Sequence, residues 1–455
     1  MTRRVLVVAD DLTGAMDTGH EFAARGCRTT VQVGGDDGDG PAEASADQSD
    51  DDASVTVVDT DSRYADADAA RESVATVVRE TVAADPDAVV YKKVDSTLRG
   101  NVAAEVTAAR AAADRPLALV APAFPANGRL TAEGHHLVDG VPVTATAAGD
   151  DAKAPATSYL PRLLGESEGG RERASVPRIA SATVARGPDA VAERLGALAA
   201  LDAGRSSGSS RPAAGTLVAC DAVHDDHLAA LADGADPGSV VFAGSGGLAR
   251  HVPLPDDGSR PPTLDPATAA DRRALAVVGS VAAATLDQVA RVPDDAVVRL
   301  DAAAAVREPE AAATDAAVAC LDRLEATGQA LVTAATDRDD VTAAREAGRA
   351  AGVPPDGVGE RVATALAATA AAVWRDADPP PTDSLLTGGA VARATLDALD
   401  AAAVAPVGRE LGAGIPVGLV RGGVADGTPL VTKAGAFGGD GVIANYLGGE
   451  VTDDA

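Results

Sequence analysis

Residues 88–101, AVVYKKVDSTLRGN, join an apolar run to a dense polar loop. The run from Ala88 to Tyr91 is typical of a buried strand in a parallel sheet. The polar groups that follow would emerge at the carboxyl end of that strand, which is where open α/β sheets bind ligands. Lys92 and Lys93 are two of only four lysines in the chain. Because a compact ammonium suits a point contact with phosphate or carboxylate, we interpret this loop as part of a binding site, the alternative being a surface loop with a chance lysine pair.

Similar apolar runs alternate with helical patterns along the rest of the chain. This alternation predicts βαβ units, and a segment rich in Pro, Asp and Ser at 253–266 is typical of a linker. We therefore expect an α/β fold of two domains, each built on a mostly parallel sheet flanked by helices, at residues 1–252 and 273–455 with a linker at 253–272. The segment at 34–53 is acidic and glycine-rich, which predicts a solvated insertion. The other predicted strands are Val5–Val8, Thr29–Val33, Val55–Val58, Leu117–Ala121, Leu275–Val278, Val297–Leu300, Ala330–Ala334, Ser384–Leu386, Val417–Val420 and Leu430–Thr432.

Composition limits the classes of partner. The chain has 455 residues, 46% of them hydrophobic, and a net charge of −29, which argues against binding to nucleic acid or an anionic membrane. The three cysteines are widely spaced and no apolar run reaches membrane-spanning length, so we expect a soluble protein of a reducing cytoplasm. Abundant Asp and Ala with scarce Lys resemble the proteins of salt-loving archaea, where surface carboxylates maintain solubility.

Two adjacent carboxylates, Asp10 and Asp11, follow the first predicted strand. A carboxylate at a strand end can act as a general base or hold a metal, although Asp11 can equally cap the helix that follows. Adjacent residues of a strand point in opposite directions, so if the extended geometry persists, only one of the two carboxylates can face the cleft. We favour a catalytic Asp10, with Asp11 as a structural or supporting residue of the substrate site.

Two arginines, Arg63 and Arg99, also follow predicted strand ends. Two guanidinium forks suit a small carboxylate substrate, although each alone is more often a surface ion pair. The sequence HDDH at 224–227 has a metal-compatible spacing but lies in an acidic loop, and we assign no metal ligand.

Glycine loops follow three predicted strands of the second half, at Gly279-Ser280, at Thr387-Gly388-Gly389 and in KAGAFGG at 433–439. Glycine allows backbone N–H groups to approach phosphate closely, and a helix that follows favours anions. The chain has neither GxxxxGK[ST] nor GxGxxG, so we predict a nucleotide-phosphate site of another kind.

Taken as a set, these motifs resemble the four-carbon acid sugar kinase family over nearly the whole chain. The segments ADDLTGA at 9–15, DSR at 61–63, KKVDSTLRGN at 92–101 and PAFP at 122–125 with Gly128-Arg129 resemble its N-terminal domain. The three glycine loops resemble its C-terminal nucleotide-binding domain, except that Ala436 stands where a glycine is expected. The family includes D-threonate, D-erythronate and 3-oxo-tetronate 4-kinases, which use ATP.

The resemblance implies an ATP-dependent kinase, with Mg²⁺, that phosphorylates the terminal 4-hydroxyl of a four-carbon sugar acid in a cleft between the domains. Either Asp10 or Asp95 would accept the hydroxyl proton, no metal ligand is assigned, and a homodimer is expected. The alternatives are a kinase of a longer acid such as a pentonate, a phosphatase, and a sugar-acid sensor without turnover. Adjacent carboxylates argue against the phosphatase, and a sensor would not need the glycine loop of Lys433. The implied substrate contacts are Asp11, Arg63, Lys93, Ser96 and Arg99, and the implied nucleotide contacts are Ser280, Gly388, Gly389, Lys433, Ala434 and Gly435.

Overall fold

The computed structural model describes residues 4–33, 53–165, 176–206, 216–255, 258–264 and 271–449. The chain divides into two compact units. Unit 1 comprises Met1–Thr29 and Asp51–Arg260, and unit 2 comprises Thr30–Asp50 and Pro261–Ala455. The predicted insertion at 34–53 lies outside the described residues, apart from Ala53.

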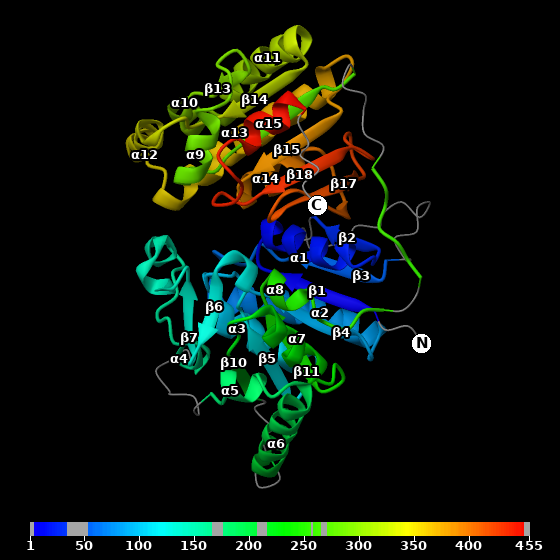
Figure 1. Cartoon of the computed structure of the whole chain (residues 1–455). Helices are drawn as coiled ribbons and strands as arrows, with labels where there is room; N and C mark the ends of the chain where they lie inside the picture. The colour runs from blue at the N-terminus through cyan, green and yellow to red at the C-terminus, as the bar shows by residue number, and fades with distance from the viewer. Residues whose placement is uncertain are drawn as a thin grey trace. The chain divides into compact units, whose positions relative to one another are not determined.

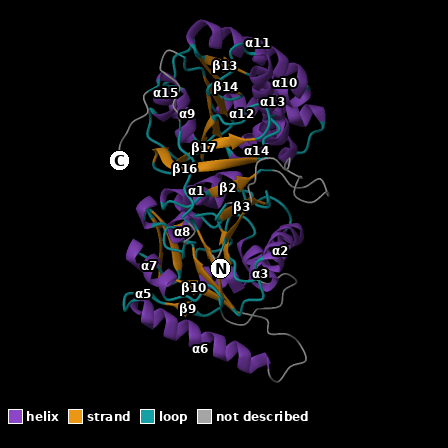
Figure 2. Ribbon diagram, turned by 90° about the vertical axis from the view of Figure 1, so that its right-hand side faces the viewer, coloured by secondary structure: helices purple, strands orange, loops and turns teal. Residues whose placement is uncertain are grey.

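Unit 1 is built on a parallel sheet with helices on both faces (Figure 1). The strand order is β3-β1-β4-β11-β5-β10-β9, and each neighbouring pair is parallel. In Figure 2, α2 and α3 lie on one side of the strands and α7 and α8 on the other. The strands are β1 (Val5–Ala9), β3 (Val55–Asp59), β4 (Val89–Lys93), β5 (Leu117–Ala121), β9 (Arg178–Ile179), β10 (Thr216–Cys220) and β11 (Val240–Gly244). The helices are α1 (Leu12–Ala24), α2 (Ala67–Ala84), α3 (Val102–Ala112), α4 (Leu160–Gly165), α5 (Ser181–Val184), α6 (Pro188–Ser206), α7 (Asp225–Asp233) and α8 (Gly246–Ala249).

A smaller antiparallel sheet in unit 1 has the strand order β6-β7-β8. Its strands are Arg129–Ala132, His135–Val138 and Val141–Pro142. Short 3₁₀ helices flank it at Pro125–Asn127, Val143–Ala145 and Ala147–Asp150.

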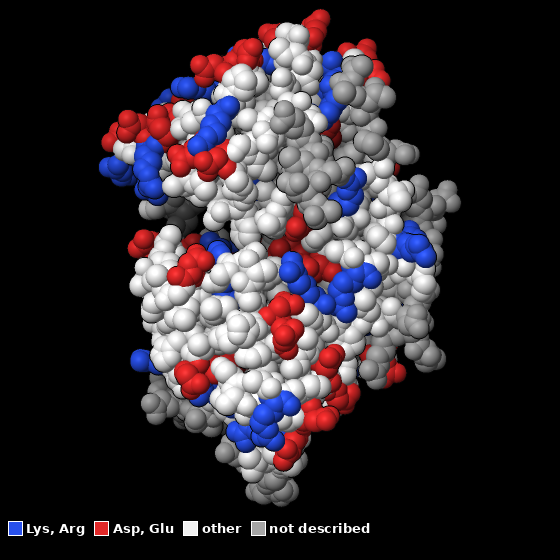
Figure 3. Space-filling model, in the orientation of Figure 1, with Lys and Arg blue, Asp and Glu red and all other residues white. Residues whose placement is uncertain are grey.

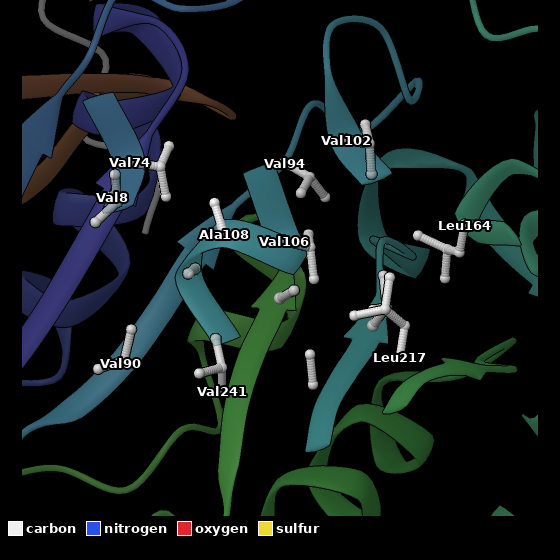
Figure 4. Packing of buried hydrophobic residues seen from close by; sticks show 14 of the residues in the cluster. Val8, Val74, Val90, Val94, Val102, Val106, Ala108, Leu164, Leu217 and Val241 are labelled. Carbon is white, nitrogen blue, oxygen red and sulfur yellow. The ribbon is translucent and has the colours of Figure 1, made fainter. Parts of the chain in front are cut away.

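Aliphatic side chains on one face of the main sheet of unit 1 form a buried core with α2 and α3. Val90 of β4 and Val94, the residue after it, lie in this core, where Val94 is close to Val106 of α3 (Figure 4). Burying one such side chain stabilises the fold by about 1.5–3 kcal/mol. The alternate residue Tyr91 contacts Phe22 of α1 edge to face, with ring centroids 6.5 Å apart. Consecutive residues of β4 therefore project toward different helices, which decides where the lysines that follow can reach.

Unit 2 has a mixed sheet with the strand order β13-β14-β12-β15-β18-β17-β16-β2. The pairs from β13 to β18 are parallel, and the remaining pairs are antiparallel. The strands are β2 (Thr29–Gln32, in unit 2 from Thr30), β12 (Ala274–Val278), β13 (Val297–Arg299), β14 (Gln329–Thr333), β15 (Asp383–Thr387), β16 (Ala403–Gly412), β17 (Ile415–Arg421) and β18 (Pro429–Lys433). The helices are α9 (Ala283–Val289), α10 (Ala302–Arg307), α11 (Pro309–Thr327), α12 (Arg338–Ala351), α13 (Pro355–Asp376), α14 (Gly389–Ala398) and α15 (Val442–Gly448).

These sheets confirm the predicted α/β fold with mostly parallel strands flanked by helices. The long hairpin of β16 and β17 was not predicted beyond Val417–Val420, because the apolar run that begins β16 contains Pro406, which argues against a strand. Both units also have a point where the strand order reverses. In unit 1 the chain passes from β1 to β3 on one side and then to β4 on the other, and in unit 2 β12 is followed by β13 and β14 on one side and by β15 on the other. Ligands of open α/β sheets bind at the carboxyl ends of strands at such points.

Charged side chains of both signs cover the helices α11 and α12 of unit 2 (Figure 3). Within the described ranges, no helix is long and apolar enough to cross a membrane.

Candidate functional site

Both carboxylates that follow β1 bind the same guanidinium. Arg63 donates from Nε to Asp10 Oδ2 at 2.8 Å and from Nη2 to Asp10 Oδ1 at 3.0 Å. It also donates from Nη1 to Asp11 Oδ2 and from Nη2 to Asp11 Oδ1, each at 2.7 Å. The alternation of a strand does not extend to these two residues, because β1 ends at Ala9 and the chain then turns into α1. Asp11 also caps that helix by accepting from the Gly14 N–H at 2.8 Å, as the alternative interpretation predicted.

Arg63 is buried, with 6% of its surface exposed, and its guanidinium is largely occupied by these carboxylates. Burial lowers the pKa of Arg63, but Asp10, Asp11 and Asp95 outweigh it and raise that pKa well above its ordinary value. Burial raises the pKa of the Asp10 carboxyl, but Arg63, Lys92 and Lys93 outweigh burial and lower that pKa overall. Arg63 thus holds both carboxylates in place.

The loop after β4 holds a second carboxylate–guanidinium pair. Asp95 accepts from Arg99 Nε and Nη2, each at 2.8 Å, and from the Thr97 hydroxyl. Arg63 Nη2 lies 3.9 Å from Asp95 Oδ1, so the two pairs are neighbours. Burial raises the pKa of Asp95, but Arg99 and Arg63 lower it well below its usual range. The Arg99 side chain is 29% exposed, so part of its guanidinium remains accessible.

The adjacent lysines of β4 have different surroundings. Lys92 is fully buried and its Nζ lies 2.9 Å from Glu105 Oε2 of α3, while Ser62 donates to Glu105 Oε1 at 2.7 Å. Lys93 lies on the α1 side, and its Nζ is 2.9 Å from the position that a Cβ on Gly14 would occupy. Lys93 is 4% exposed, and within the described residues its ammonium has no hydrogen-bond or ion-pair partner. Lys92 is a structural cation, whereas Lys93 is available to an anion.

Ser96 enters the site through its backbone. Its carbonyl oxygen lies 2.8 Å from Nε2 of His136 in β7, and His136 Nδ1 lies 3.0 Å from the Thr131 hydroxyl. Burial lowers the pKa of His136 to about 4, so the imidazole is neutral near pH 7. This histidine ties the loop after β4 to the small antiparallel sheet.

The three glycine loops of unit 2 start from neighbouring strand ends. Val278 pairs with Thr387, and Thr387 pairs with Lys433, so β12, β15 and β18 end at one level. Gly388 has φ +94°, and a Cβ there would lie 3.2 Å from the Ser280 amide nitrogen. A Cβ on Gly435 would lie 2.2 Å from Ser280 Oγ. The structure therefore brings Ser280, Gly388 and Gly435 together.

Helix α9 holds the last of these loops. Thr285 donates to the Gly435 carbonyl at 2.8 Å, and Gln288 Nε2 donates to the carbonyls of Phe437, Gly438 and Gly439 at 3.0–3.2 Å. The carbonyls of the loop are thereby turned toward α9.

Lys433 is 1% exposed, and its ammonium has only neutral partners within the described residues. They are the Thr285 hydroxyl at 3.2 Å and the carbonyls of Ala434 and Gly435 at 3.2 and 3.4 Å. Desolvation lowers the pKa of Lys433 to about 8. A buried ammonium without a carboxylate gains from binding an anion.

Two features of unit 1 were not predicted from the sequence. The loop Gly244-Ser245-Gly246-Gly247 follows β11, and Gly244 pairs with Lys93. An apolar run followed by glycines, the pattern that predicted the glycine loops of unit 2, also occurs here. Asp17 was also missed, because a single acidic residue inside a helical pattern carries no local signal.

Among the described residues, no group of three or more His, Cys, Asp or Glu side chains is placed to hold a metal.

Two family models match the chain. The model described as a sugar-binding N-terminal domain matches residues 5–252, and the model described as a nucleotide-binding C-terminal domain matches residues 275–443. The chain is 31% identical to a D-threonate kinase of Salmonella typhimurium, covering 98% of this chain and 97% of that protein. It is 34% identical to a D-threonate kinase of Bordetella bronchiseptica (96% and 95% covered) and 32% identical to a 3-oxo-tetronate kinase of Methylobacterium radiotolerans (95% and 96%).

A solved structure from Haemophilus influenzae has the same fold, with a TM-score of 0.68 at 20% identity over 98% of this chain and 100% of that chain. A sugar-binding domain followed by a nucleotide-binding domain defines a class of two-domain sugar kinases. Within that class, the chain belongs to the four-carbon acid sugar kinase family.

Proposed function

We propose that this chain is an ATP-dependent kinase that phosphorylates the terminal 4-hydroxyl of a four-carbon sugar acid such as threonate, erythronate or 3-oxo-tetronate. The relatives that match over their full length carry the names of such kinases. The structural observation that carries the proposal is Lys433, a buried ammonium with neutral partners among glycine loops at the point where the strand order of unit 2 reverses.

The nucleotide phosphates would bind at Ser280, Gly388, Gly389, Lys433, Ala434 and Gly435. Gly388 and Gly389 begin the ten-residue helix α14, which has no acidic residue in its first turn and no side chain capping its start. Its N–H groups are therefore available to an anion. Lys433 adds a full positive charge beside them, which suits developing charge in phosphoryl transfer.

Mg²⁺ would be held through the nucleotide phosphates, because the described residues provide no carboxylate cluster for it. When bound, it would supply neutralisation of charge on the phosphate oxygens. The protein groups that would neutralise phosphate charge are Lys433 and the amides of the glycine loops.

The sugar acid would bind in residues 1–252, where donors and acceptors occur together. The accessible part of Arg99 is the cation for the carboxylate, and the Lys93 ammonium is a further polar contact. Asp10 and Asp95 are the catalytic candidates from the sequence, and Asp11 and Ser96 lie beside them. Ionised carboxylates accept hydrogen bonds from substrate hydroxyls through their remaining lone pairs. The low pKa values of Asp10 and Asp95 suit orienting a hydroxyl more than removing its proton.

The first test is ADP formation with Mg²⁺-ATP at high salt against both enantiomers of threonate and erythronate, 3-oxo-tetronates and pentonates. We expect one four-carbon acid to give turnover far above the background ATPase rate, and phosphorus NMR to show a phosphomonoester on the terminal carbon. Turnover of a pentonate alone would move the substrate to a longer acid. ATP binding without turnover on any acid would reject the substrate class, and folded protein that binds no ATP would reject the kinase.

Sedimentation of the active protein tests the expected homodimer.

A further inference from the structure

Asp17 differs from the other carboxylates near the strand ends of unit 1. It lies in the second turn of α1, and a Cβ on Gly246 would lie 2.9 Å from its Oδ2. The glycine after β11 therefore leaves the space that this carboxylate occupies. Its side chain is partly exposed. Within the part of the chain that the structure describes, Asp17 has no hydrogen bond and no ion pair.

The neighbouring carboxylates are already engaged. Asp10 and Asp11 share the guanidinium of Arg63, and Asp95 is bound by Arg99 and Thr97. A carboxylate that accepts two or more charged hydrogen bonds holds its negative charge strongly and is a weak proton acceptor.

Lys93 and Asp17 lie near the same part of α1, because Lys93 Nζ is 2.9 Å from the Cβ position of Gly14, which is one turn before Asp17. The Lys93 ammonium lowers the pKa of Asp17, yet the described residues contain no ion pair within 4.0 Å between them. Each of these two groups, one cation and one anion, has unused hydrogen-bonding capacity. A hydroxyl placed between them can donate to Asp17 while its oxygen accepts from Lys93.

Other charged groups also act on Asp17. Burial is the largest effect and raises the pKa of Asp17, and the Asp11 carboxylate raises it further. Lys93 from β4 and Arg250 after α8 oppose this, but Arg250 is itself bound by Glu21 through two hydrogen bonds of 2.8 Å. The net shift is upward, toward the range of a general base that works near neutral pH.

We propose that Asp17 is the catalytic carboxylate that accepts the proton of the phosphorylated hydroxyl, with Lys93 holding the oxygen of that hydroxyl. This inference rests on the proposed kinase function. The hydroxyl oxygen forms a bond to the γ-phosphorus of ATP, the bond from that phosphorus to the bridging oxygen breaks, and its electron pair leaves with ADP. The hydroxyl proton passes to a carboxylate oxygen of Asp17 and later to water. Asp10 and Asp95 orient the substrate.

The test compares Asp17→Asn with wild type on the acid that wild type phosphorylates. We expect kcat to fall about 10²–10⁴-fold, with KM for the acid and for ATP changed by less than about threefold. In wild type, kcat/KM should fall toward acid pH as Asp17 becomes protonated, and the raised pKa moves this limb above that of an ordinary aspartate. The residual activity of Asp17→Asn should lack the limb.

Asp233→Asn is the matched control, because Asp233 is an exposed residue at the end of α7 and should leave kcat and the pH profile unchanged. If Asp17→Asn does not fold, Asp17→Glu replaces it, and we expect at least a tenfold loss of kcat with the acid limb shifted but present. Unchanged kcat, a change in KM alone, or an acid limb that persists in Asp17→Asn would overturn the assignment. A wild type inactive on every acid would remove the proposed function and this inference together, whereas an active wild type with an equally active variant removes the inference alone.

Discussion

The cations at the strand ends of unit 1 and unit 2 are neutralised in different ways. In unit 1, Arg63, Arg99 and Lys92 each bind a carboxylate at 2.7–2.9 Å. Lys93 differs from these three, because its ammonium has no such partner among the described residues. In unit 2, Lys433 is buried like Arg63 and Lys92, but its partners within the described residues are a hydroxyl and two carbonyls. A prearranged set of paired charges offers both donors and acceptors, as a hydroxy acid requires. A lone ammonium among glycine amides offers only positive potential, as a polyphosphate requires.

The difference has an energetic consequence. Removing one partner of a buried ion pair leaves an uncompensated charge, whereas removing a lone buried cation relieves a desolvation cost. Substitutions of the paired residues of unit 1 should therefore act first on stability, and substitutions of Lys433 should weaken ligand binding without lowering stability.

The largest effect is expected for Arg63→Ala. Asp10 and Asp11 would remain buried or half-buried without their guanidinium, so the free energy of unfolding should fall by about 3–5 kcal/mol in urea titrations. Arg79→Ala is the control, since the ion pair of Arg79 with Glu72 is exposed and its loss should change that free energy by less than about 1 kcal/mol. Equal effects of the two substitutions would break the comparison.

Lys433→Met should lower kcat/KM for ATP about 10²-fold, because one charge that stabilises the phosphates is lost. In the absence of nucleotide, its free energy of unfolding should equal or exceed that of wild type, since a desolvated charge is removed. Kinetics and urea titrations on the same preparation check both statements. Arg291→Gln, which removes a cation from an exposed pair with Asp440, should change neither quantity. Marked destabilisation by Lys433→Met would show that Lys433 is a structural cation.

The affinity for ATP should depend on alkaline pH. With a pKa of about 8, Lys433 is about 91% protonated at pH 7 and about 9% at pH 9, so an anion that needs the ammonium should bind about tenfold more weakly at pH 9. Calorimetric titration of ATP from pH 7 to 9 measures this, with Lys433→Arg as the variant that stays charged. The affinity for the sugar acid should not fall in this way between pH 7 and 9, because Arg99, which holds the carboxylate, has a raised pKa and stays charged. An ATP affinity that is flat across this range would contradict the role of Lys433.

The smallest effect concerns the close approach of two loops in unit 2. A methyl group at Gly435 would meet Ser280 Oγ, and because that hydroxyl can rotate, we expect Gly435→Ala to cost only about 1 kcal/mol and to raise KM for ATP a few-fold. Gly439→Ala in the same loop has open space around the added methyl and should behave as wild type. Combining Gly435→Ala with Ser280→Ala should recover stability if the contact is the cause, and no recovery would place the cause elsewhere.

The α/β architecture and the segments that carry chemistry could be predicted from the amino-acid sequence. Both signals are local, because an apolar run marks a strand and the residues that follow it emerge at the carboxyl edge of the sheet. The glycine loops before α14 and after β18 were found in this way. The same rule would have found Gly244-Ser245-Gly246-Gly247 after β11.

Which charged groups meet could not be predicted, because it depends on how distant segments pack. Lys92 lies on the face of β4 toward α3 and pairs with Glu105. Lys93 lies on the opposite face, where its ammonium has no partner among the described residues. Asp10 and Asp11 both bind Arg63 because β1 ends at Ala9, so the alternating side-chain directions of a strand do not apply to these two residues. Asp17 acquires its environment from β4 and α8, elements distant in sequence. The electrostatic state of a buried group depends on such distant partners, and a local pattern of residues does not record them.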